Sequence, residues 1–121
     1  MLRVSLFGIL SAFLVSAGAV AELLTLEVEH ATFGFDRRTG EPVVTVRLTE
    51  QAKLRFGQFT TDHVGKKIEF RVDGQSIMTP VLRTPILGGT LQIADKLDTE
   101  RVRKLVERLS SGAKIEVEVR E

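Results

Sequence analysis

The chain has 121 residues, which is enough for one domain and too few for two. It contains no Cys, Trp or Tyr, which excludes disulfides and thiolate metal sites and argues against a platform for stacking sugars or bases. Arg3 lies in a leader-like segment, and without that segment the chain carries 16 Lys and Arg against 16 Asp and Glu, so it lacks the positive surface that nucleic acid requires.

The first 21 residues have the pattern of a secretory signal peptide. A positive start at Met1–Arg3 precedes the largely apolar run Val4–Val15, and Ala19-Val20-Ala21 is a small-x-small cleavage site. We therefore expect cleavage after Ala21, a domain over residues 22–121, and export to the bacterial periplasm. The alternative is a retained membrane anchor, but the apolar stretch of about 17 residues reaches only the lower limit for crossing a bilayer.

Two strands are predicted at the start of this domain. Leu24–Glu29 alternates apolar and polar residues, as a half-buried strand does, and the strand is expected to continue to Phe33 or Phe35. A polar turn over residues 36–42 joins it to a second strand, Val43–Leu48.

A helix is predicted next, with Thr49 as its N-cap and Gly65 as the residue that ends it through a positive φ. Its buried face is expected to carry Ala52, Phe56 and Phe59.

The second half of the domain is also predicted to contain strands and one helix. Lys67–Val72 and Gln75–Met78 flank Asp73-Gly74, a strong hairpin signal, and Thr90–Ile93 reads as a short strand. A second helix follows, with Asp98 as N-cap, Leu97 as a hydrophobic staple, Gly112 as the glycine after its end, and an apolar stripe of Val102, Leu105, Val106 and Leu109. Lys114–Val119 closes the domain as a strand.

The order β-β-α-β-β-(β)-α-β predicts an α+β fold in which two helices pack on one face of a mainly antiparallel sheet.

No catalytic or metal site is predicted. His30 and His63 lack the spacing of metal ligands, and no nucleophile motif accompanies the Asp62-His63 pair. No phosphate-binding pattern surrounds Gly88-Gly89, and the charged residues from Arg101 to Arg108 are interpreted as a solvated face because acids interleave them. We expect no cofactor and no enzyme activity.

Residues 48–112 closely resemble the head subdomain of the first periplasmic domain of SecD, an accessory membrane subunit of the bacterial protein-translocation machinery. The Val-Gly-Lys, Val-Asp-Gly and Pro-Ile-x-Gly-Gly blocks are specific in combination. The resemblance is carried, in chain order, by Ala52-Lys53, Phe56, Thr60–Lys66, Val72–Gly74, Met78–Leu82, Thr84–Gly89, Leu91–Ile93 and Ser111-Gly112.

The resemblance implies transient contact with unfolded polypeptide that leaves the translocon. It does not imply proton-driven work, which in SecD depends on membrane helices. The alternative is a structural or inhibitory module that docks on one folded periplasmic or membrane partner.

Contact with polypeptide is expected in the segment from Thr79 to Gly89. Its prolines bar it from a central strand, so it should form an edge or a projecting arm with exposed aliphatic side chains on a flexible glycine base. The alternative is a purely structural role, in which these aliphatic side chains tuck under the second helix and close the core. The candidate residues are Thr79, Pro80, Pro85, Ile86, Leu87, Gly88 and Gly89.

Overall fold

The computed structural model describes residues 23–94 and 98–120, and the predicted signal peptide and Leu97 lie outside these ranges. The strands form two antiparallel sheets. The four-stranded sheet has the order β1-β7-β4-β5 and the three-stranded sheet the order β2-β3-β6. Their bounds are β1 Leu23–Leu26, β2 Val28–Phe35, β3 Pro42–Leu48, β4 Lys67–Val72, β5 Gln75–Met78, β6 Thr90–Ile93 and β7 Ile115–Arg120.

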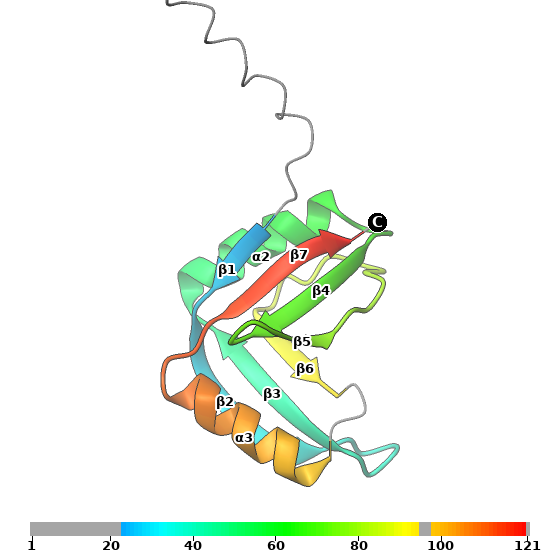
Figure 1. Cartoon of the computed structure of the whole chain (residues 1–121). Coiled ribbons are helices and arrows are strands. Elements are labelled where there is room, and N and C mark those ends of the chain that lie inside the picture. Colours follow the sequence, from blue (N-terminus) through cyan, green and yellow to red (C-terminus); the bar gives the residue numbers. More distant parts are fainter. Residues whose placement is uncertain (1–22, 95–97, 121) are drawn as a thin grey trace, which may run out of the picture.

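Two helices cover these sheets. The helix α2, Glu50–Asp62, contacts β1 and β3 and therefore touches both sheets, whereas α3, Thr99–Ser110, lies across β2 and β3 (Figure 1). The α+β class, the antiparallel pairing and both helices are thus confirmed, but the expectation of a single sheet with both helices on one face is wrong.

The first predicted strand is divided between the two sheets at Glu27. Leu26 pairs with Ile115 of β7, and Val28 pairs with Leu48 of β3. The carbonyl of Glu27 accepts a hydrogen bond from the backbone N–H of Thr49, at 3.1 Å. Alternation along the sequence shows which residues share a face but not which strand each half will pair with, so the division could not be anticipated.

A bulge in β2 changes which residues point inward. The register with β3 shifts between Val28 and His30, so that the inward positions change from even to odd numbers. Ala31 is accordingly buried and Phe33 packs against the core, although the alternation of the first residues would place even-numbered side chains inside.

The helix caps form as predicted. The Thr49 hydroxyl accepts from the N–H of Ala52 at 3.2 Å, and the Asp98 carboxylate accepts from the N–H of Arg101 at 2.8 Å. Gly65 and Gly112 have φ of +93° and +107°, the left-handed conformation expected after a helix end.

Asp73 and Gly74 both have positive φ, as a two-residue type I′ turn requires, and the turn directs β5 back along β4.

One core fills the space between the helices and the two sheets. The largest fully buried side chains include Leu26, Val44, Val46, Phe56, Ile68, Ile93, Val102, Ile115 and Val117.

Candidate functional site

The segment Thr79–Gly89, called the 79–89 segment below, starts as an edge of the four-stranded sheet. The carbonyl of Pro80 accepts from the N–H of Ile68 at 2.9 Å, and the N–H of Leu82 donates to the carbonyl of Lys66 at 2.8 Å. The segment thereby extends the line of β5 beside β4. The prediction of an edge position is confirmed.

The far end of the segment is fixed to α2 and to the end of β3. The N–H of Ile86 donates to the Thr60 hydroxyl at 2.9 Å, and the carbonyl of Gly89 accepts from the N–H of Leu48 at 2.8 Å. Gly89 is buried with a φ of +75°, and a Cβ there would lie 3.0 Å from Lys53. The expectation of a projecting arm on a flexible glycine base is therefore wrong, because Gly89 is an anchored turn.

The two aliphatic residues that were expected to be exposed have different environments. Leu87 is 62% exposed, whereas Ile86 is half-buried and packs against the core. Both residues lie beside Gly57 of α2. The alternative that both side chains tuck under the second helix is therefore wrong, although Ile86 does pack against the core. Thr79, Pro80, Pro85 and Gly88 are exposed.

An apolar groove of about 400 Å³ runs between the 79–89 segment and β6. Its walls include Phe70, Met78, Leu82, Ile86 and Leu91. Val81 lines this groove and is exposed, and Leu87, the residue after Ile86, is exposed just outside it.

Leu54 was missed by sequence reasoning. It is 70% exposed and shares a shallow hollow with Gly57 and Leu87. Its exposure could have been predicted from the sequence, because Leu54 falls outside the buried helical stripe of Ala52, Phe56 and Phe59.

Charged side chains form a network on the outer face of the four-stranded sheet. Arg71 contacts Glu69 and Glu118, each at 2.8 Å, and Arg120 contacts Glu69 at 2.7 Å. A hydrogen bond from Ser76 and the nearby guanidinium groups of Arg120 and Arg71 lower the pKa of Glu69. These charges neutralise one another, so the network is structural.

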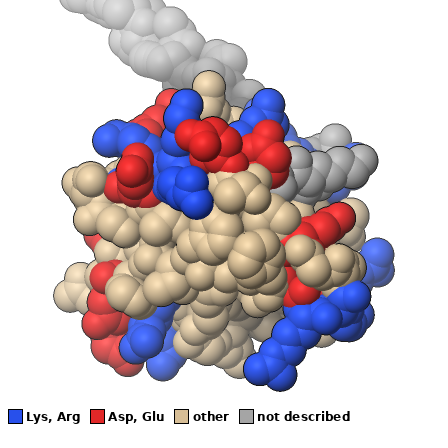
Figure 2. Space-filling view, turned by 90° about the horizontal axis from the view of Figure 1, so that it is seen from below, with Lys and Arg blue, Asp and Glu red and all other residues tan. Residues whose placement is uncertain are grey.

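Another face of the molecule has few charged side chains in its middle. Figure 2 shows a face on which charged side chains lie mostly at the margin and uncharged side chains fill the middle.

The histidines have no arrangement suited to catalysis. His30 is exposed in β2, and the Nδ1 atom of His63 lies 2.8 Å from the carbonyl oxygen of Phe59 at the end of α2. Among the residues that the structure describes, no three His, Asp or Glu side chains gather as a metal site would require. Within the same residues, no helix is long and apolar enough to cross a membrane.

Comparison with known families gives one result. The model of the SecDF P1 head subdomain matches residues 13–114, a range that begins inside the predicted signal peptide.

Curated relatives give the same family. The protein translocase subunit SecD of Thermobaculum terrenum is 36% identical over 87 residues, which are 72% of this chain and 17% of the relative. The SecD of Dictyoglomus turgidum is 33% identical over 86 residues, which are 71% of this chain and 21% of that protein. The chain therefore spans about a fifth of the length of these relatives.

Two solved structures have the same fold. One is of SecDF, described as a membrane component that enhances protein export, and matches with a TM-score of 0.66 at 28% identity over 72% of this chain and 39% of that one. The other is SecDF in a super-membrane-facing form, with a TM-score of 0.67 at 27% identity over 78% of this chain and 13% of that one. The chain belongs to the SecDF P1 head subdomain family.

Proposed function

We propose that the chain is a non-catalytic module of the bacterial periplasm that binds polypeptide as an accessory to protein translocation. Its curated relatives are named protein translocase subunits, which supports the link to transport. The observation that carries the proposal is the exposed Leu87 next to an apolar groove along the 79–89 segment. Exposed aliphatic groups bordering a groove at a sheet edge suit an extended chain with apolar side chains.

Substitution of Leu87 tests the proposal. Removing an exposed leucine that becomes buried on binding forfeits about 1.5 kcal/mol, which corresponds to roughly a tenfold weaker affinity. Leu87→Ser should therefore weaken capture of a labelled, chemically unfolded model protein by about that factor. It should leave the melting temperature nearly unchanged, because Leu87 is mostly exposed.

Leu23→Ser is the matched control. Leu23 is 56% exposed in β1, at the opposite edge of the four-stranded sheet from β5. If both variants bind unfolded protein as the unaltered chain does, the 79–89 segment is not the binding surface. Ile86→Ser is unsuitable as a test, since Ile86 packs against the core and its loss would also lower stability.

Export and processing form a separate part of the proposal. The positive start, apolar run and Ala-x-Ala pattern support cleavage after Ala21, which gives a mature chain that begins at Glu22. Mass spectrometry of the exported protein measures this directly, and an intact Met1 in the membrane fraction would contradict it.

The second candidate function is docking on one folded periplasmic or membrane partner, as a structural or inhibitory module. The anchoring of the 79–89 segment favours it, because the backbone is held at Pro80, Leu82, Ile86 and Gly89. A fixed surface of this kind suits a partner of fixed shape.

A further inference from the structure

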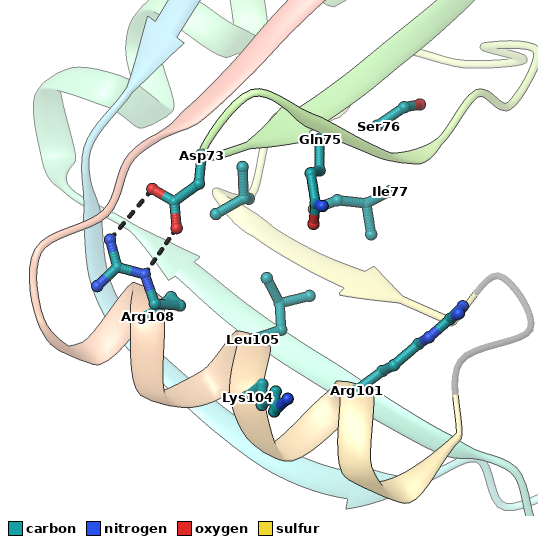
Figure 3. Close-up of a pocket in the computed structure, with 9 residues that line it drawn as sticks. Asp73, Gln75, Ser76, Ile77, Arg101, Lys104, Leu105 and Arg108 are labelled. Carbon is teal, nitrogen blue, oxygen red and sulfur yellow. Dashed lines mark hydrogen bonds and ion pairs between the residues drawn. The ribbon is translucent and has the colours of Figure 1, made fainter.

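A second hollow separates the β4–β5 hairpin from α3. It is an open cleft of about 630 Å³, with Val72 and Ile77 on the hairpin side and Leu105 on the helix side (Figure 3). It does not include the 79–89 segment and shares no lining residue with the apolar groove.

The helix side of the cleft is positively charged. Arg101, Lys104 and Arg108 line it from positions that lie on one face of α3. Glu100 and Glu107 lie four residues before and three residues after Lys104 and so flank it on the helix, but neither lines the cleft. Of the charged residues of α3, three cations line the cleft and neither of the two acids does.

Two of these three cations have no counter-ion in the described part of the chain. Arg108 donates to both carboxylate oxygens of Asp73, at 2.6 and 3.2 Å. Arg101 and Lys104 make no ion pair with any residue within 23–94 or 98–120. Asp73 is the one acid among the described residues that line the cleft, and Arg108 is already paired with it. The described residues that line the cleft therefore carry three positive charges and one negative charge, a net charge of +2.

The opposite side of the cleft is the edge strand β5. Among the described residues it pairs with β4 alone, so its other edge is unpaired. Gln75 and Ile77 point toward α3 whereas Ser76 points away from it, so the cleft lies against one face of β5, next to this unpaired edge (Figure 3). Such an edge offers backbone hydrogen-bonding groups to an added strand.

We propose that this cleft binds acidic segments of extended polypeptide, with the backbone beside β5 and the carboxylates on Arg101 and Lys104. This rests on the proposed function and adds a preference of sequence to it. Carboxylates at alternate positions of a strand lie roughly 7 Å apart, close to the spacing of roughly 5–6 Å between helix positions three apart. The strand edge and the apolar residues between the charges favour a peptide over a lipid headgroup, which would use the charges alone.

Three labelled nine-residue peptides test the preference, with Val alternating with Glu, Gln or Lys. By fluorescence anisotropy at low salt, the Glu peptide should bind about tenfold more tightly than the Gln peptide, and the Lys peptide should bind most weakly. The difference should shrink at roughly 0.5 M salt, because exposed charges are screened.

The double variant Arg101→Gln/Lys104→Gln should lose the preference for Glu over Gln and retain the Gln peptide's affinity. Arg37→Gln/Lys67→Gln changes the net charge equally at exposed positions outside the cleft, and should retain the preference. Backbone amide shifts of Gln75–Ile77 should move on addition of the Glu peptide.

Several outcomes would overturn the inference. Equal binding of the Glu and Gln peptides, or no binding of either, would do so, as would a preference that survives in Arg101→Gln/Lys104→Gln. Binding to phosphatidylglycerol vesicles that needs Arg101 and Lys104, with no peptide preference, would assign the cleft to lipid instead. In each case capture of unfolded protein that depends on Leu87 would leave the proposed function standing, so the two failures are distinguishable.

Discussion

Gly57→Ala should stabilise the fold, and the reason lies in how freely Leu87 can move. Alanine is favoured over glycine inside a helix by about 1 kcal/mol. The new Cβ would lie 3.3 Å from the Cδ2 atom of Leu87, a close contact, and at ordinary distances from the Ile86 carbonyl oxygen and the Leu87 Cα. Because Leu87 is 62% exposed, its side chain can turn away at a cost of about 0.5 kcal/mol, which leaves a net gain of about 0.5 kcal/mol.

Thermal and urea unfolding measure this gain. A domain of this size should show a rise of roughly 2–4 °C in melting temperature. The double variant Gly57→Ala/Leu87→Ala serves as the control, since removal of the leucine side chain should release the full helical gain of about 1 kcal/mol relative to Leu87→Ala alone. A destabilisation by Gly57→Ala of about 0.5 kcal/mol or more would refute the reasoning, because it would mean that the 79–89 segment holds Leu87 rigidly on α2.

Two further substitutions test the fold. Gly65→Val should lower the free energy of unfolding by roughly 1–3 kcal/mol because a φ of +93° is strained for a branched side chain, and an unchanged melting curve would contradict this. Glu69→Gln should destabilise at pH 7, but the effect should vanish in acid. The lowered pKa of Glu69 adds stability above its ordinary value of 4.5, and that stability is lost as pH falls through the folded-state value. Equal destabilisation at pH 7 and pH 2.5 would show that the charge of Glu69 is irrelevant.

Local features of the fold were predictable because they depend on neighbouring residues. Thr49 and Asp98 act as caps through contacts within three residues, and Asp73-Gly74 defines its own turn. The division of the first strand at Glu27 depends on partners far along the chain, in β3 and β7. Alternation carries no information about such partners.

The candidate site was likewise predictable from the sequence only in part. The prolines predicted that the 79–89 segment lies at an edge, because they remove backbone donors wherever they occur. That Ile86 is fixed by the Thr60 hydroxyl, and that Gly89 is buried beside Lys53, follows from how the segment crosses α2. The positive cleft was not foreseen either, because it forms only when α3 and the β4–β5 hairpin come together.

The central claim is that this domain binds other polypeptides while they are unfolded. The ratio of its affinities for the unfolded and the folded form of one protein tests this claim most directly. A small protein without disulfides, and a destabilised variant of it that is unfolded under the same conditions, would be titrated against the domain. The account predicts that the unfolded variant binds at least about tenfold more tightly than the folded form, because only an extended chain can follow the edge and groove along the 79–89 segment. Equal affinity for the two forms, or tighter binding of the folded form, would contradict it.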